Sequence, residues 1–207
     1  FSGLDTGLMS GSRLGFRGTE ALGNGLHAVF QAEFGFKADQ YDSKGTSAGA
    51  GVFNNLRNSW VGLHHADYGT LSLGRQNSVS YDWVAKGYAS DVTVTHPSNT
   101  VLGASFVQLN TGDRVNNSIK YLSPNWSGFE LRAIYGFGEV VGSPNTPTVK
   151  TNEGDWSDAG RYGIGAAYKN GPIDVALIYQ GIARNDTVAN DGSVNGWSLG
   201  GSYDFKV

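Results

Sequence analysis

The fold is decided by the stretch Trp197-Ser198-Leu199-Gly200-Gly201-Ser202-Tyr203-Asp204-Phe205-Lys206-Val207, in which apolar residues alternate with small or polar ones. Trp197, Leu199, Tyr203 and Phe205 fall on one parity of this stretch, whereas serine, aspartate and lysine fall on the other. Successive side chains of a β-strand point to opposite faces, so a two-residue period is typical of a strand. We therefore expect a strand with one apolar face and one polar face.

The same alternation recurs along the whole chain, and no segment favours an amphipathic helix. We expect an all-β fold with about nine strands, at residues 12–20, 25–37, 53–65, 69–76, 114–122, 128–138, 160–169, 172–181 and 196–207.

Short and long connections alternate between these segments. Compact turns with Gly, Asn, Asp or Pro lie at 22–25, 66–69, 123–128 and 169–172, and long polar stretches at 38–51, 77–113, 139–159 and 183–195. Tight turns at one end and long loops at the other are typical of an antiparallel up-and-down transmembrane barrel. A soluble β-sandwich is the alternative. Aromatic residues near the strand ends and ionisable residues deep inside the strands favour the barrel.

The composition excludes several other classes of protein. The chain of 207 residues has no cysteine, which excludes disulfide scaffolds and thiolate metal sites. Its net charge of -3 gives no overall attraction to nucleic acid. No run approaches the ~18 apolar residues of a membrane-spanning helix.

Several ordered blocks of the sequence resemble strands of the Gram-negative general porins, the diffusion porins of the outer membrane, and especially their β-proteobacterial branch. These blocks are residues 12–20, 22–26, 30–33, 60–63, 68–76 and 117–124. The resemblance implies a sixteen-stranded barrel that forms a homotrimer in the outer membrane of a Gram-negative bacterium. It also implies a long third loop that folds into the lumen.

The strand count departs from this family pattern, because about nine strands cannot close a sixteen-stranded barrel. We therefore expect residues 1–207 to form one partial barrel domain that lacks the family's first strand and its last strands. The alternative is a small plugged barrel of eight or ten strands, acting as a structural or adhesive protein through its external loops. A polar interior and a long infolded loop argue against that alternative.

Passive diffusion needs a water-filled passage whose charges select solutes, so charged residues on the inner parity are the candidate site residues. Arg13 and Arg17 lie opposite Leu14 and Phe16 in the alternation, which places both arginines inside. Arg114 shares its parity with Asn116, Ser118 and Lys120 and lies opposite Val115, Ile119 and Tyr121. Arg132 is a further candidate by parity.

Arg75 is not placed inside by its parity, because strict alternation puts it with Leu71 and Leu73 on the apolar face. The porin resemblance maps Arg13, Arg75 and Arg114 onto the family's basic cluster, and a bend at the strand end would turn Arg75 inward. The alternative for each arginine is contact with solvent or lipid headgroups.

The connection over residues 77–113 is long enough to be functional, and it resembles the pore-constricting loop of the porins. Its acidic residues are few: Asp82, Asp91 and, at its far end, Asp113. We take Asp91, with Asp82, as the acids that face the arginines. A basic wall with few opposing carboxylates predicts a preference for anions. The alternative is that Asp82 and Asp91 only cap turns.

Nothing in the sequence favours catalysis or a cofactor. His64 and His65 are adjacent, so in a strand they point to opposite faces and cannot form a two-ligand clamp. No G-x-S-x-G motif and no phosphate-binding glycine loop is present. We expect a protein that is not an enzyme, with no metal and no nucleic-acid partner. Its partners would be small hydrophilic solutes, inorganic ions and outer-membrane lipid.

Overall fold

The computed structural model describes residues 12–36, 55–83, 114–138, 160–183 and 194–206, and the statements below concern these residues. They form nine strands: β1 Arg13–Gly23, β2 Leu26–Gly35, β3 Asn55–His65, β4 Gly69–Asn77, β5 Arg114–Leu122, β6 Phe129–Gly136, β7 Arg161–Asn170, β8 Ile173–Ile182 and β9 Val194–Tyr203. These strands coincide closely with the nine segments expected from the alternation.

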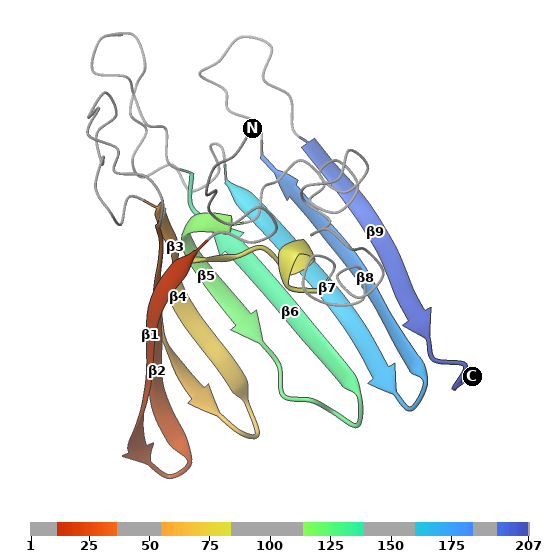
Figure 1. Ribbon diagram of the computed structural model, residues 1–207, viewed down its shortest axis with the longest axis horizontal. Coiled ribbons are helices and arrows are strands. Elements are labelled where there is room, and N and C mark those ends of the chain that lie inside the picture. The colour runs from red at the N-terminus through yellow and green to blue at the C-terminus, as the bar shows by residue number, and fades with distance from the viewer. Residues whose placement is uncertain (1–11, 37–54, 84–113, 139–159, 184–193, 207) are drawn as a thin grey trace, which may run out of the picture.

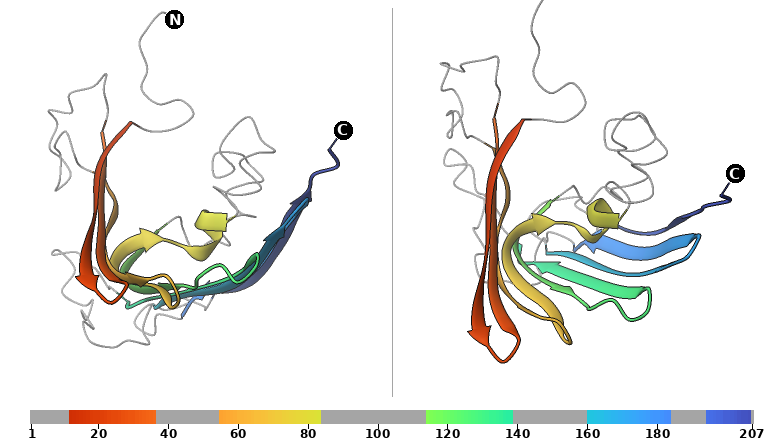
Figure 2. Two further views of the ribbon diagram at one scale, coloured as in Figure 1. Left: turned by 90° about the horizontal axis from the view of Figure 1, so that it is seen from below. Right: turned by 60° about the horizontal axis from the view of Figure 1, so that its bottom comes forward.

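The nine strands form one antiparallel sheet in which every strand pairs with its neighbour in the chain, in the order β1 to β9. The sheet curves into an open trough (Figures 1 and 2). The all-β, antiparallel, up-and-down architecture predicted from the sequence is therefore confirmed. Within the described residues the sheet does not close into a barrel, and a count of sixteen strands stays a prediction.

Tight turns join the strand pairs β1–β2, β3–β4 and β7–β8. At the first of these turns Asn24 and Gly25 have φ values of 51° and 77°. This left-handed pair is the backbone that a two-residue hairpin requires, and Asn-Gly supplies it at little steric cost. The local sequence thus fixes where the chain reverses and the register of the hairpin that follows.

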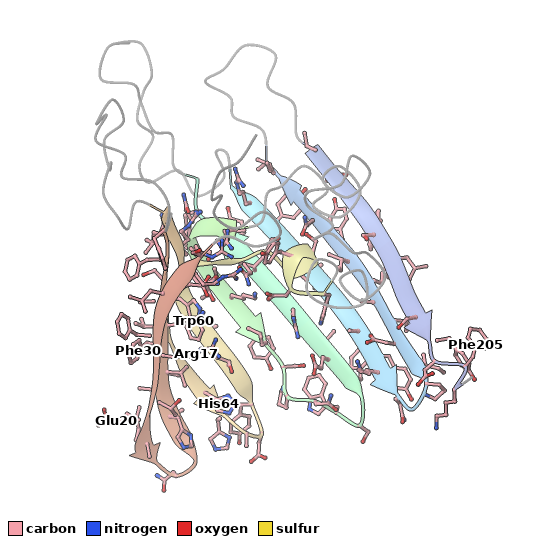
Figure 3. The ribbon with its side chains drawn as sticks, viewed as in Figure 1. Arg17, Glu20, Phe30, Trp60, His64 and Phe205 are labelled. Carbon is pink, nitrogen blue, oxygen red and sulfur yellow. The ribbon has the colours of Figure 1, made fainter. Side chains whose placement is uncertain are left out.

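The convex and concave faces of the trough differ in chemistry. Large apolar side chains lie exposed on the convex face, for example Phe16 at 59%, Val61 at 61% and Leu199 at 73%. Figure 3 shows Phe30 on this outer side, whereas Arg17 and Trp60 point to the concave side. A sheet that exposes its apolar face is built for contact with another apolar medium, and lipid is such a medium.

Aromatic side chains gather near both ends of the outer face. Towards the long connections, Tyr179 packs between Tyr162 and Trp197, with ring centres 5.9 Å and 4.5 Å away. Towards the tight turns, Tyr203 packs against Phe205 at 4.9 Å. Leucine, isoleucine and valine occupy the strands between these two groups. Two aromatic bands around an aliphatic one are typical of a wall that spans a bilayer.

The buried apolar cluster lies on the concave face rather than between two layers. Val79, Tyr81 and Trp83 follow β4 and pack with Val115, Ile134, Ala176 and Ile178. Val79 and Ile178 are completely buried. No helix in the described part of the chain is long and apolar enough to cross a membrane.

Candidate functional site

The segment of residues 78–83, which we call the inner segment, crosses the concave face of the sheet after β4 (Figure 2). It contains one helical turn over residues 79–83, in which the amide of Asp82 donates to the carbonyl of Ser78 at 3.2 Å. The backbone amide of Ser80 donates to Gln180 Oε1 of β8 at 3.3 Å. The first residues of the long 77–113 connection therefore lie against the inner wall.

Two glycines of β7 provide the surface on which the inner segment rests. A Cβ atom added to Gly165 would lie 2.5 Å from Cζ3 of Trp83 and 3.1 Å from Cγ1 of Val79. A Cβ added to Gly163 would meet Val79 Cγ2 at 3.5 Å. Because heavy atoms do not approach to 2.5 Å without displacement, a larger residue at position 165 would push Trp83 off the wall.

An ionic network fixes the polar side of the inner segment. The Asp82 carboxylate pairs with the Lys120 ammonium of β5, and their side chains are only 16% and 5% exposed. Arg132 Nη1 of β6 lies 3.7 Å from the same carboxylate. Asn77 Nδ2 donates to Asp82 Oδ1 at 3.0 Å, and Lys120 Nζ donates to the carbonyl of Asn77 at 2.9 Å. One carboxylate thus ties the segment to two strands of the wall.

Arg132 links this network to the apolar cluster. Its guanidinium lies 4.5 Å from the ring centre of Trp83, a cation–π distance. Its Nη2 also donates to Glu130 Oε2 at 3.2 Å. The Trp83 ring therefore contacts Arg132 of β6 and also lies over Gly165 of β7.

A hollow of about 520 Å³ separates the inner segment from strands β1 to β5. Its charged lining residues are the cations Arg13, Arg17 and Lys120 and the carboxylates Glu33 and Asp82. Amide and hydroxyl groups come from Gln31, Asn58, Gln76, Asn77, Thr70 and Ser72, and Trp60 and Leu122 complete the lining. Both carboxylates have a cation of their own, because Asp82 pairs with Lys120 and Glu33 accepts from Arg57 Nε at 2.5 Å. The hollow is polar and carries excess positive charge.

The structure brings several of the predicted site residues together. Arg13 and Arg17 line the hollow with Asp82, and Arg132 joins Asp82 from β6. Arg114 lies further along, with its guanidinium carbon 5.4 Å from the ring centre of Tyr81 in the inner segment. Asp91 lies outside the described residues.

Arg75 stands apart from this group. Its Nε donates to the carbonyl of Leu56 at 2.8 Å, and its Nη1 donates to Oδ1 of Asn116. Gln76, the next residue, turns to the inner face, where its Oε1 accepts from the hydroxyl of Ser72 at 2.5 Å. The alternation therefore keeps Arg75 away from the hollow, and its expected place in the basic cluster stays a prediction from the resemblance.

The expected facing of residues 114–117 needs a correction. Alternation predicted that Val115 points outward, but it is only 3% exposed and packs in the inner cluster. Asn117 has a φ of 42°, and the pairing of β4 with β5 shifts between Gly74 and Gln76. This β-bulge reverses the facing of the residues before it, which a strict two-residue period does not anticipate.

Lys120, Arg57 and Glu33 are charged residues of the inner face that were missed as site residues. Lys120 shares the inner parity, yet only the fold reveals that Asp82 comes back to meet it. Arg57 faces Glu33 because the β2–β3 pairing shifts between Ala32 and Phe34. The only feature of the sequence that could have indicated Arg57 is its position as a charged residue within an expected strand. No cluster of three potential metal ligands among His, Cys, Asp and Glu occurs in the residues described by the structure.

Comparison with known proteins now places the chain in a family. The Gram-negative porin family matches residues 2–207. The chain belongs to that family. It is 32% identical over 227 residues to an outer membrane porin protein of Bordetella pertussis, covering 99% of the chain and 51% of that relative. It is 33% identical over 214 residues to outer membrane porin protein 32 of Delftia acidovorans, covering 99% of the chain and 54% of the relative.

A solved porin shares the same fold. The structure aligns with the anion-selective porin from Comamonas acidovorans with a TM-score of 0.66 and 29% identity, covering 99% of this chain and 57% of that one. This chain spans about half the length of the curated relatives that it matches. The resemblance to β-proteobacterial porins is confirmed, and so is the outer membrane of a Gram-negative bacterium as the location.

Proposed function

We propose that this porin forms a water-filled channel through which small hydrophilic solutes and inorganic ions diffuse passively, with a preference for anions. The observation that carries the proposal is the concave face, where a polar hollow with excess positive charge lies beneath a segment folded in from the wall. The solved neighbour is named an anion-selective porin, which agrees with this charge balance.

The sign of the selectivity follows from how the charges on the inner face are paired. Glu33, Asp82, Glu130 and Asp174 each have a cation at ion-pair distance. The hollow itself is lined by three cations, Arg13, Arg17 and Lys120, and by only two carboxylates, Glu33 and Asp82. At ~0.1 M salt the Debye length is about 10 Å, so wall charges act across a narrow passage, and more strongly where low-dielectric walls surround it. Anions therefore concentrate in the passage and cations are depleted.

The connection over residues 77–113 would narrow the channel. Its first residues are held against the wall by Val79, Trp83 and the Asp82 network. We assign Asp91 as the further acid facing the basic wall, in keeping with the sequence. Arg75 would contribute at the rim of the wall.

The complete protein would be a closed sixteen-stranded barrel that assembles as a homotrimer with outer-membrane lipid around it. Backbone groups at an open sheet edge cannot be satisfied by lipid, so β1 and β9 need partners on their free sides for the sheet to span a membrane. Passive diffusion requires no nucleophile, general base or cofactor, and we propose none. The plugged, adhesive barrel is the less favoured alternative.

Single-channel recording in planar bilayers tests this function. The complete porin polypeptide should give discrete conductance steps, with a reversal potential under a potassium chloride gradient that favours chloride. Simultaneous exchange of Arg13 and Arg17 for glutamine should reduce the chloride preference. A reversal potential favouring potassium would contradict the anion preference, and the absence of steps would support the plugged barrel.

A further inference from the structure

The hollow between the inner segment and β1–β4 has the features of a binding site, and we propose that it binds small carboxylate anions that carry a planar aromatic ring. Arg17 would hold the carboxylate and Trp60 would stack on the ring. The inference rests on the proposed channel function and adds a substrate class to it.

Arg17 carries a positive charge that can bind an incoming carboxylate. It lines the hollow from β1, is exposed, and makes no ion pair or side-chain hydrogen bond within the described part of the chain. The carboxylates of the hollow are engaged elsewhere, Glu33 with Arg57 and Asp82 with Lys120. A guanidinium in this state presents its planar, forked donors to a carboxylate that enters the hollow.

Trp60 provides the surface for the ring of the ligand. A large apolar ring on the concave, water-facing side is unusual in this sheet. Its neighbours on the concave face are mostly small or polar, and the large rings of β6–β9 lie on the outer face. Trp60 is half-buried and lines the same hollow. Its cross-strand partner on β4 is Gly74, which has no side chain to cover the indole.

The register places the two groups at a spacing that suits one ligand. Arg17 pairs with Gln31 and Gln31 pairs with Trp60, so the three residues form a row across β1, β2 and β3 on the inner face. Two strand spacings separate Arg17 from Trp60, roughly 10 Å between their Cα atoms. Both side chains reach into the hollow, where Figure 3 shows them on the same side of the sheet. The Gln31 amide between them offers a further donor to a carboxylate.

The volume of the hollow also fits this class of ligand. About 520 Å³ is within the usual range of small-molecule sites, and it exceeds the need of a chloride ion. A hollow built only for inorganic anions would not require an indole face. Weak stacking on a charged wall would slow an aromatic carboxylate in passage and raise its local concentration without closing the channel.

Three probes separate the charge contribution from the ring contribution. Benzoate has both groups, benzamide has the ring without the charge, and acetate has the charge without the ring. Their half-blocking concentrations for the chloride current are measured in planar bilayers with the complete porin. We expect benzoate to block at about fivefold lower concentration than either of the other probes, from one stacking contact and one charge-assisted pair.

Two variants and two matched controls locate the site. Arg17→Gln should raise the benzoate value about fivefold, towards that of benzamide, and Trp60→Leu should raise it towards that of acetate without changing acetate. Trp197→Leu on the outer face and Lys206→Gln beyond β9 should leave all three values unchanged. Equal values for benzoate and acetate in the unaltered protein would overturn the proposal, as would a benzoate value that Trp60→Leu leaves unchanged.

A calorimetric titration of benzoate into the detergent-solubilised porin makes the same comparison without a current. A benzoate affinity that falls about fivefold in Arg17→Gln supports the site even if the bilayer recordings contradict the channel. Absence of binding in a porin that conducts overturns the site while the proposed function stands.

Discussion

At the scale of single residues, Asp82 joins the inner segment to the wall through several contacts. Its carboxylate neutralises Lys120, approaches Arg132 and accepts from Asn77, so one side chain both anchors the inner segment and lowers the positive charge of the wall. These contacts place the charge of Asp82 on the concave wall. Capping a turn, the other role considered for Asp82, does not account for its pairing with β5 and β6.

Exchange of Asp82 for asparagine should therefore make the channel more anion-selective. The exchange removes one negative charge from the concave wall, and a unit charge ~10 Å from a permeating ion in water contributes about 0.4 kcal/mol, or about twofold in relative permeability. The reversal potential under a salt gradient measures this ratio. Asp174→Asn is the matched control, since its partner Lys169 is 74% exposed and already surrounded by water. An equal shift in both variants would contradict a special role for Asp82.

At the scale of elements, the inner face of β7 is shaped to receive the inner segment. A side chain added at Gly163 or Gly165 would lie on the inner face, but only the one at Gly165 would meet Trp83. The packing of the inner segment against the wall thus depends on the absence of a side chain at position 165 of β7.

Gly165→Ala should loosen the inner segment, whereas Gly163→Ala should be nearly neutral. The new methyl at 165 would lie 2.5 Å from the Trp83 ring, whereas at 163 the nearest atom is Ile134 Cγ2 at 3.3 Å. The Trp83 ring would be displaced from β7, and the inner segment would become more mobile. Open-channel current noise should rise in Gly165→Ala and not in Gly163→Ala. Similar noise in the two variants would show that Trp83 does not depend on the glycine.

Most of the fold and part of the site could be predicted from the sequence. Alternation located the nine strands that the structure describes and placed Arg13, Arg17 and Arg132 on the inner face, because side-chain parity is a local property of a strand. The bulges near Asn117 and between Ala32 and Phe34 could not be predicted, since they depend on pairing with a neighbouring strand. The contact of Asp82 with Lys120 likewise depends on how the chain returns across the sheet, which no local period encodes.

At the scale of the whole molecule, the sheet separates two environments. Its convex face presents aliphatic side chains between two aromatic bands, and its concave face presents charges, amides and hydroxyls. On the proposed function, the same nine strands contact lipid on one side and form the wall of an aqueous passage on the other.

Adjacent residues of β9 should respond oppositely to the same substitution. Leu199→Lys places a charge in the aliphatic band of the outer face, where a lysine near the bilayer midplane costs about 2–4 kcal/mol. Ser198→Lys places the charge on the inner face, where water solvates it. Urea unfolding of the complete porin in lipid vesicles should show this loss for Leu199→Lys and little change for Ser198→Lys. Comparable losses for the two would contradict the assignment of the faces.

The most direct test of the two-faced wall is single-cysteine labelling along β9. The chain has no cysteine of its own, so each introduced thiol reports only its own position. Trp197, Ser198, Leu199 and Gly200 are replaced one at a time in the complete porin, and a charged, membrane-impermeant maleimide is added to the protein in vesicles. The channel account predicts labelling at 198 and 200 and protection at 197 and 199. Protection at 198 and 200, with or without labelling at 197 and 199, would contradict a water-filled passage along the concave face.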